Sequence, residues 1–564
     1  MINVKKKFPY WSLFYEEDGY NITGDRIMGR QAAGWSFLKA LVKNSDDLSV
    51  YLKNLDHKQL LIDKIQPLLT GNRKLNLNVI KYSEPYKSSE YGGIFFPGPG
   101  IHNLVSNRSY YGHDSYSVVG ITHTTASHQV MSDISSLAVS DVMPWDAIIC
   151  TSDCVLDTVN KIIDHRYDKL SSKFSIKDPV YPKLPIIPLG LDKDEFDFSD
   201  DFKKQSRSDL NINDDDIVLV YVGRLSFHAK AHHLPMYLSI EECAKELKKD
   251  QKIHIIQTGW FPNDFIKDTF VNEGKEISPS VEFHFLDGKD QDNKYKTLAA
   301  GDIFISLSDN IQETFGLTPL EGMASGLPVV VSDWNGYKST VRDNIDGFRV
   351  KTYSLKPGFS EDIAYDHMMD VINYDHYIGM SVQRVAIDII DCINKLKILI
   401  KNKDKRKLFG EAGKKRVKEV FDWPNILVQY KDLSNELNSI RQKESKNYTK
   451  FCSPSFPSDK LDPFDIFSSY PTYSLDETIL YIKSDQINKT PIKDILNFNS
   501  ITYSKNYLPN ESEILSIFNS FDNFNTLTLE KIVSLTDLDK DIIFRSLIFL
   551  IKYGYIAILE NKHD

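Results

Sequence analysis

Cysteine is scarce in this sequence, with only five residues in a chain of 564. Five scattered cysteines are too few for the disulfide framework on which small secreted domains depend. Cys150 and Cys154 stand four residues apart, but no second pair of ligands accompanies them, so this spacing does not predict a zinc site. We therefore expect five reduced thiols in a cytoplasmic protein.

Long apolar runs and an excess of basic residues are also missing. No stretch of about 18 apolar residues predicts a transmembrane helix, and residues 1–20 lack the apolar core of a signal peptide. The net charge of −10 and the pI of about 5.8 argue against a general nucleic-acid binder. Hydrophobic residues, at 41%, are sufficient for packed cores. The length indicates about three or four domains.

The segment 313–336 combines several local signals of an α/β unit. Thr318 is predicted to be a helix N-cap, with Glu321 closing a capping box. Gly326 suits the left-handed position after the helix. Buried parallel strands are predicted on either side, over residues 301–308 and 327–331. The loop before the helix is therefore expected at the carboxyl end of a strand, where open α/β sheets bind ligands.

Two carboxylates, Glu313 and Glu321, flank this loop. The amides between them converge on a helix N-terminus, which attracts phosphate. These amides belong to Phe315, Gly316, Leu317 and Thr318. A diphosphate on the amides and sugar hydroxyls on the carboxylates would suit both features. The alternative is that Glu321 only closes the capping box and Glu313 is a solvated loop acid.

The pattern E-x7-E followed by G-M-A-x-G-x-P-V-V resembles the signature of retaining GT-B glycosyltransferases, particularly glycosyltransferase family 4. Further matches extend the resemblance over about residues 20–440. It implies two Rossmann-like domains facing across a cleft, with a nucleoside-diphosphate sugar as donor and no obligatory metal cofactor. By the same resemblance, Glu313 contacts the transferred sugar and Glu321 contacts the ribose diol.

Residues 1–187 are predicted to form the first, acceptor-side domain. Its expected strands are 77–82, 91–96, 116–122, 145–150 and 184–188. A glycine-rich turn from Gly29 to Gly34 leads into a helix pattern, and the resemblance implies that Gly29 and Arg30 face the cleft. His123 ends a strand. It is either a structural hydrogen-bonding residue or, as in similar enzymes, a group that reaches the donor sugar.

Residues 188–410 are predicted to form the second, nucleotide-sugar-binding domain, entered through a connector at 185–192. Arg224 leaves the carboxyl end of the buried strand 217–222, and Lys230 follows it. Two cations there would neutralise a diphosphate leaving group. The alternative is an ordinary surface Arg and Lys, and the resemblance to the family's diphosphate clamp favours the first reading.

The predicted strands 253–259 and 281–287 come next, and the second ends at Asp287. By resemblance, this end lies near the nucleobase. The Asp290-Gln291-Asp292 triplet has the form of a metal-nucleotide motif of another glycosyltransferase fold. Because a helix pattern follows directly, we favour helix capping over metal binding.

The last part of the chain divides into three predicted regions. Residues 411–443 resemble the family's helices that cross back to the first domain. Residues 444–509, rich in Ser, Asn, Pro and Phe, are expected to be a linker or a segment laid over the surface. Residues 510–564 predict a helical module like a winged helix. Acidic residues outnumber basic ones 16 to 11 from 450 to 564, which favours a protein or acceptor partner over nucleic acid.

The sequence thus predicts a retaining glycosyltransferase that moves a sugar from a nucleoside-diphosphate sugar to an acceptor hydroxyl. In such enzymes the acceptor attacks from the front face and the leaving phosphate takes its proton, so no separate general base is named. Two alternatives stay open. One is a sugar-nucleotide epimerase or phosphorylase on the same fold, and the other is a catalytically idle nucleotide-sugar-binding scaffold.

Overall fold

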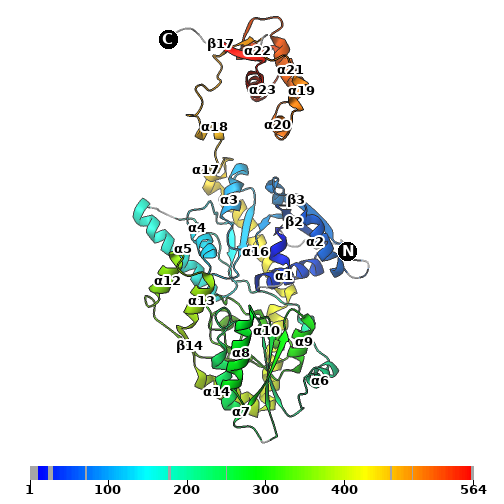
Figure 1. Cartoon of the computed structure of the whole chain (residues 1–564), viewed down its shortest axis with the longest axis vertical. Coiled ribbons are helices and arrows are strands. Elements are labelled where there is room, and N and C mark those ends of the chain that lie inside the picture. The colour runs from blue at the N-terminus through cyan, green and yellow to red at the C-terminus, as the bar shows by residue number, and fades with distance from the viewer. Residues whose placement is uncertain are drawn as a thin grey trace. The chain divides into compact units, whose positions relative to one another are not determined.

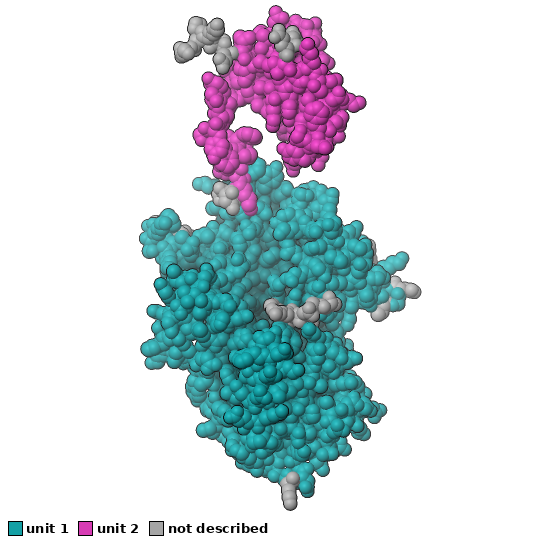
Figure 2. Space-filling view, in the orientation of Figure 1, with its two compact units in different colours: residues 1–457 teal, residues 458–564 magenta. Residues whose placement is uncertain are grey.

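The computed structural model describes residues 11–22, 29–69, 71, 73–175, 179–248, 250–457, 460–484 and 487–559. The chain forms two compact units, residues 1–457 and residues 458–564 (Figure 2). Among the described residues, no helix has the length and apolar content needed to cross a membrane.

The first domain is built on a six-stranded parallel sheet in the order β3-β2-β1-β4-β5-β6. Its strands are β1 Ser12–Tyr15, β2 Asp47–Leu52, β3 Asn76–Lys81, β4 Gly93–Phe95, β5 Ser117–Ile121 and β6 Ala147–Ile149. Its main helices are α1 Gly29–Asn44, α2 His57–Ile65, α3 His102–Arg108, α4 His128–Ser136 and α5 Asp153–Phe174. This strand order is that of a Rossmann sheet, whose central reversal lies between its first and fourth strands.

Two sequence predictions for this domain are wrong. Residues 184–188 do not form a strand, because only an isolated bridge links Ile186 to Cys150. The stretch from Gly29 to Gly34 is not a turn but the start of α1. Gly34 is needed there for close packing, since a Cβ at this position would lie 2.3 Å from the carbonyl oxygen of Gly19.

The second domain repeats the same sheet, in the order β12-β11-β10-β7-β8-β9. Its strands are β7 Ile217–Val222, β8 Ile253–Gly259, β9 Val281–Asp287, β10 Ile303–Ser306, β11 Val329–Ser332 and β12 Gly347–Val350. Its helices include α6 Asp200–Ser208, α7 His233–Ala244, α8 Asp264–Ile277, α9 Gln291–Ala300, α10 Leu317–Ala324, α11 Tyr337–Thr340, α14 Ile389–Lys401 and α15 Lys403–Arg416. Every residue of β7 is buried, as expected for a central parallel strand with helices on both faces. The two sheets confirm the predicted pair of Rossmann-like domains.

A side excursion leaves the second sheet between β12 and α14. It consists of β13 Thr352–Ser354, α12 Glu361–Met368, α13 Tyr374–Val382 and β14 Val385–Ile387. The sequence predicts an irregular, aromatic segment over residues 365–380, which is wrong because α12 and α13 cover most of it. Both helices are short and carry mixed polar and aromatic residues, so no helical periodicity marks them. The strands β13 and β14 pair antiparallel and close the excursion at its base.

The 22-residue helix α16, Trp423–Glu444, returns to the first domain (yellow in Figure 1). The Trp423 indole donates a hydrogen bond to Ser36 Oγ in α1 at 2.8 Å. Tyr430 packs against the rings of Trp11, Phe37 and Phe95. The helix therefore completes the hydrophobic core of the first domain, although the second domain separates the two in sequence.

The C-terminal unit has a three-stranded antiparallel sheet in the order β16-β15-β17. Its elements are α18 Pro463–Ile466, β15 Leu480–Lys483, α19 Ile492–Leu496, α20 Asn499–Thr502, α21 Glu511–Ser520, β16 Thr526–Thr528, α22 Leu529–Thr536, α23 Lys540–Lys552 and β17 Ile556–Leu559. The helix–turn–helix of α22 and α23 turns at Asp537 in the left-handed conformation, and β17 follows it as a wing strand. The central strand β15 lies well before residue 510, so the region 444–509 supplies part of this unit.

Candidate active site

The candidate site lies at the carboxyl ends of β7 and β10, which are neighbours in the middle of the second sheet. The chain leaves β7 toward β8 on one side and leaves β10 toward β11 on the other. The two loops therefore diverge at the topological switch point of the sheet, where open α/β sheets bind ligands, and we call the region between the two loops the crevice. Four predicted residues, Arg224, Lys230, Glu313 and Glu321, lie on or beside these loops.

Arg224 follows Gly223, whose φ of +150° is a conformation that favours glycine and redirects the chain out of β7. One terminal nitrogen of Arg224 donates to the carbonyl oxygen of Ala229 at 2.7 Å. The guanidinium also lies over the Trp260 ring, 5.8 Å from its centroid. Burial lowers the pKa of Arg224, and the nearby carboxylate of Asp375 opposes this shift.

Lys230 and Glu313 form an ion pair between the two loops, from Nζ to Oε2. The Glu313 side chain is 8% exposed and that of Lys230 is 22% exposed, so a ligand in the crevice can still reach the ammonium. Tyr337 is fully buried, and its hydroxyl donates to Glu313 Oε2 at 3.5 Å. Burial and the neighbouring Glu313 carboxylate raise the Tyr337 pKa well above its ordinary value, so its hydroxyl keeps its proton.

Glu321 lies one turn inside α10, and its Oε1 accepts a hydrogen bond from Lys294 Nζ at 2.6 Å. Its other oxygen, Oε2, is buried, and no described residue pairs with it; the same is true of Thr318 Oγ1. The predicted capping box is wrong, because Gly316 is the N-cap and no side chain caps this helix. Glu321 is thus available for a role other than capping.

The N-terminus of α10 is shaped by the loop that enters it. Gly316 has a φ of +90°, and a Cβ there would lie 2.2 Å from the Tyr337 ring. No described group accepts a hydrogen bond from the amides of residues 315–318. The side chain of Phe315 turns inward onto Phe421. What this terminus offers to a ligand is therefore backbone N–H, as predicted for an anion site.

Asp287 is the last residue of β9, at the far edge of the same carboxyl end, and its side chain accepts the amide of Lys289 at 2.9 Å. It is exposed, so its carboxylate remains accessible. Asp290 is the N-cap of α9, and its carboxylate accepts the amide of Asp292 at 2.9 Å. The predicted capping role of the Asp290-Gln291-Asp292 triplet is confirmed by this bond.

In the first domain, the structure brings two of the predicted residues together. His123 follows β5, and burial together with the charge of Arg30 lowers its pKa to about 4. Arg30 lies in the first turn of α1, directly after Gly29, and pairs with Asp18 at 2.5 Å. His123 is therefore neutral at pH 7, not a cation.

The two domains meet beside these loops. Ser152, the N-cap of α5, donates its hydroxyl to the carbonyl oxygen of Thr314 at 2.9 Å. Ser339 donates to Asp153 at 2.9 Å. The loop that carries Glu313 is thus held from the first domain as well as from its own.

Asp309 is a buried acid next to this loop that the sequence analysis did not single out. Its Oδ1 accepts the amide of His232 at 3.1 Å. Burial raises its pKa to about 7, a shift that backbone hydrogen bonds only partly offset. A substantial share of this side chain is therefore protonated at neutral pH.

Three further side chains at the site, Lys294, Gln312 and Tyr337, were also missed. Lys294 and Tyr337 reach the signature glutamates from 27 and 24 residues away in sequence. Gln312 donates its side-chain amide to the Ala229 carbonyl, the same oxygen that Arg224 uses. Only the adjacency of Gln312 to Glu313 could have drawn attention to it.

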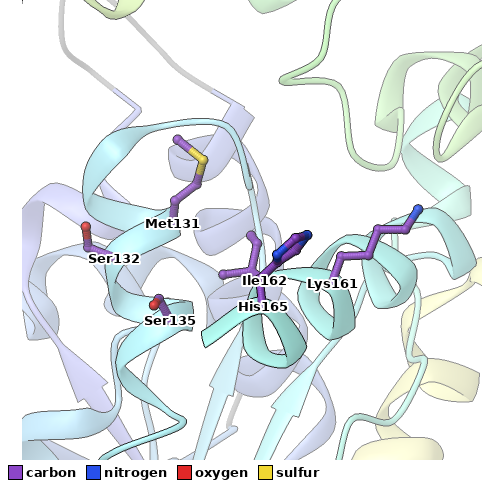
Figure 3. Close-up of a pocket in the computed structure, with 6 residues that line it drawn as sticks. All are labelled: Met131, Ser132, Ser135, Lys161, Ile162 and His165. Atoms are coloured by element: carbon purple, nitrogen blue, oxygen red, sulfur yellow. The ribbon is translucent and has the colours of Figure 1, made fainter. Parts of the chain in front are cut away.

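An open surface depression lies away from the crevice, between α4 and α5 (Figure 3). Its lining consists of Met131, Ser132, Ser135, Lys161, Ile162 and His165. Lys161 is paired with Asp157, and none of the predicted site residues lies here. Within the described ranges, no group of three or more His, Cys, Asp or Glu side chains is arranged to hold a metal ion.

In a comparison with known families, residues 202–365 match the model of the family described as glycosyl transferases group 1. An uncharacterized glycosyltransferase of Methanocaldococcus jannaschii is 26% identical over 253 residues, which is 42% of this chain and 59% of the relative. The sulfoquinovosyl transferase of Arabidopsis thaliana is 28% identical over 146 residues, 26% of this chain and 21% of the relative. The chain thus spans less than two thirds of the length of these relatives. The matched segment contains all four residues of the crevice. It confirms the resemblance to a glycosyl transferase over these residues, whereas the retaining mechanism and family 4 stay predictions.

Among solved structures, HepE of Anabaena in complex with UDP and glucose is similar, with a TM-score of 0.47 and 16% identity. The similarity covers 76% of this chain and 99% of HepE. Sucrose-phosphate synthase of Thermosynechococcus elongatus has a TM-score of 0.45 and 14% identity over 76% of this chain and 98% of its own.

Proposed function

We propose that this chain, which carries a group 1 glycosyl transferase segment, is a retaining glycosyltransferase that uses a nucleoside-diphosphate sugar. The observation that carries the proposal is the crevice between β7 and β10. There, the ion pairs Lys230–Glu313 and Lys294–Glu321 and the guanidinium of Arg224 accompany a helix N-terminus whose amides are not used by described residues. Such a set suits one diphosphate with a sugar hydroxyl on each side of it.

Each group has a part that follows from its chemistry. Arg224 and Lys230 stabilise the charge that develops on the departing diphosphate, together with the amides at residues 315–318. Glu321 offers its unpaired Oε2 to a ribose hydroxyl, and Thr318 Oγ1 lies on the same helix turn. Glu313, oriented by Lys230 and Tyr337, accepts hydrogen bonds from hydroxyls of the transferred sugar.

The proposed chemical step needs no side chain that acts as a general base. The bond between the anomeric carbon and the diphosphate oxygen breaks, and the acceptor oxygen forms a bond to the same face of that carbon. Because the new bond forms on the face that the diphosphate leaves, the configuration is retained, and the acceptor proton passes to the departing phosphate. His123 is neutral and donates or accepts a hydrogen bond at the sugar from the first domain. No obligatory metal is expected, because two cationic side chains serve the diphosphate.

The test is incubation with a panel of nucleoside-diphosphate sugars, followed by mass spectrometry. Slow release of free sugar and nucleoside diphosphate from one donor is the expected result, and proton NMR should show the donor's anomeric configuration in the first product. Chelation of divalent metals should leave the rate unchanged. Conversion of the donor into an epimer without release of sugar would support the epimerase hypothesis instead. Inversion at the anomeric carbon would contradict the retaining mechanism.

For the C-terminal unit we infer a protein or acceptor partner rather than DNA. Two of the three cations of α23 already have acidic partners: Lys540 pairs with Glu477 at 3.4 Å, and Arg545 pairs with Asp541, whereas the third, Lys552, lies over the Tyr553 ring. Duplex DNA binding relies on several free Lys or Arg contacts to phosphate. Ile548 of the same helix is 51% exposed, which favours an apolar contact.

A further inference from the structure

Helix α13 lies beyond the segment that matches the glycosyl transferase family, which ends at residue 365. It belongs to the side excursion and packs against both domains. Ile378 is fully buried in a small cluster with Ala126 of the first domain and Ala229 of the second. The helix therefore fills the space between the loop after β5 and the loop after β7.

A chain of hydrogen bonds runs through this helix from one domain to the other. The Tyr374 hydroxyl lies 3.5 Å from Thr124 Oγ1 and donates to Gln312 Oε1 at 3.3 Å. Because the Tyr374 hydroxyl donates its proton to Gln312, the Thr124 hydroxyl is the donor in the hydrogen bond between Thr124 and Tyr374. Gln312 in turn donates to the Ala229 carbonyl oxygen, which also accepts from Arg224 at 2.7 Å.

The packing of α13 fixes the loop that carries Arg224. A Cβ on Gly379 would lie 3.0 Å from His228 Cβ, so the helix backbone approaches the 226–231 loop more closely than most side chains permit. On its other side, the His228 carbonyl oxygen accepts from Asn310 Nδ2 at 2.8 Å. The loop is thus held between α13 and the loop after β10.

We propose that Tyr374 is a positioning residue that links contact between the two domains to the placement of Arg224 and Gln312. The inference rests on the proposed function, because it assigns Arg224 to the departing diphosphate. Thr124 directly follows His123 in sequence. The hydrogen bond between Thr124 and Tyr374 therefore orders Arg224 and also positions His123 relative to the donor sugar. Arg224 and His123 are both in place only when this hydrogen bond is formed.

The first test compares Tyr374→Phe with Tyr377→Phe. Both residues lie on α13 and are partly buried, but Tyr377 stacks on His367, and no described residue is hydrogen-bonded to its hydroxyl. With the donor identified by the panel and water as acceptor, Tyr374→Phe should lower kcat about tenfold, the effect of one lost hydrogen bond. The KM for the donor should change less than about threefold, because positioning matters most in the transition state. Tyr377→Phe should behave as the unaltered protein, and an equal loss in both variants would overturn the proposal.

The second test uses Thr124, the other end of the link. Thr124→Val removes the hydroxyl at constant shape and should reproduce the loss, whereas Thr124→Ser should retain activity. If the two groups act through one contact, Thr124→Val combined with Tyr374→Phe should cost no more than either change alone. Losses that multiply in the double variant would contradict the link.

A third measurement needs no substrate. In Tyr374→Phe, amide hydrogen exchange over residues 223–231 should become faster than in the unaltered protein and in Tyr377→Phe. If no donor is consumed by the unaltered protein, the proposed function fails, yet this exchange still decides whether Tyr374 holds the Arg224 loop. Unchanged exchange in Tyr374→Phe refutes the inference while leaving the proposed function standing.

Discussion

The two sheets of this protein share one strand order, yet the loops at their carboxyl ends differ in chemistry. In the second domain, the loops after β7 and β10 bring Arg224, Lys230 and Glu313 together with a helix N-terminus. In the first domain, the loop after β5 presents His123, whose lowered pKa of about 4 keeps it neutral. The strand order is the same in both domains, and the side chains of the loops place the paired charges in the second domain.

This difference between the domains predicts two kinds of contribution to the reaction rate. Charged groups near a developing anion act strongly on the rate, whereas a neutral hydrogen bond contributes less. If the second domain holds the diphosphate and the first only orients the sugar, substitutions in the two domains should differ in size. The predictions below test that contrast.

The largest effect is expected from the cations of the second domain. Arg224→Ala and Lys230→Ala should each lower turnover by about two orders of magnitude, comparable to the loss of one preorganised charge at a leaving group. Steady-state kinetics with the identified donor measures this loss, and circular dichroism should show that both variants remain folded. Unchanged turnover in either variant would falsify its role on the diphosphate.

The two glutamates should respond in different quantities. Glu313→Gln should lower turnover by about thirtyfold, since it touches the transferred sugar and hydrogen bonds to charged groups contribute about 2 kcal/mol. Glu321→Gln should mainly weaken nucleotide binding, because ribose contacts exist in the ground and transition states alike. Calorimetry with the bare nucleoside diphosphate separates them. If Glu313→Gln loses affinity and Glu321→Gln does not, the two roles are reversed.

His123 of the first domain should matter less than either cation. His123→Ala should lower turnover about tenfold, the amount expected for one neutral hydrogen bond. Because its pKa of about 4 lies far below neutrality, it should add no inflection to the pH–rate profile between pH 6 and 8. Rates measured across this range check both points, and an inflection near pH 6.5 that disappears in His123→Ala would show a charged histidine.

Asp309 offers a test of stability rather than rate. Its folded pKa of about 7 lies above the ordinary value of 3.8, so the folded state binds an extra proton between these values. The contribution of Asp309 to the free energy of unfolding is therefore fully present below about pH 4 and is lost as the pH rises to 7. Asp309→Asn should raise the free energy of unfolding by about 2–4 kcal/mol at pH 8 and by much less at pH 5. Urea titrations at the two values should show this difference, and an equal effect at both would contradict the buried acid.

The smallest effect on the crevice is expected from removing the C-terminal unit after Pro457, because the site lies wholly within residues 1–457. Calorimetry should give the same nucleoside-diphosphate affinity within about twofold, while transfer to the natural acceptor should fall. The isolated unit should not bind duplex DNA. Salt-sensitive, submicromolar DNA binding would overturn the assignment of a protein or acceptor partner.

Much of this arrangement could be predicted from the sequence because its signals are local. The apolar runs that form β8 and β9 were placed at their observed bounds, since glycine or charged residues end each run. The signature around Glu313 and Glu321 identified the crevice because its residues are consecutive. Arg224 and Lys230 belong to one short loop, and the resemblance to the family's diphosphate clamp was needed to distinguish them from ordinary surface residues.

The predictions that failed depend on contacts distant in sequence. Gly34 suggested a turn, and only the approach of Gly19 explains a glycine inside α1. The helix start at residue 317 is set by Tyr337 packing on Gly316, which local capping rules do not contain. Tyr374 lies 250 residues from Thr124 and 62 from Gln312. No pattern along the chain marks such a link.

The return of α16 to the first domain has a consequence for how the protein is made. The first domain needs Tyr430 to cover Trp11, Phe37 and Phe95, but the ribosome synthesises the whole second domain before it reaches this residue. An N-terminal domain normally folds first during synthesis. The core of the nascent first domain therefore stays incomplete, with the rings of Trp11, Phe37 and Phe95 uncovered, until α16 leaves the ribosome. The second sheet is synthesised in full before α16, so it can close before the core of the first domain is complete.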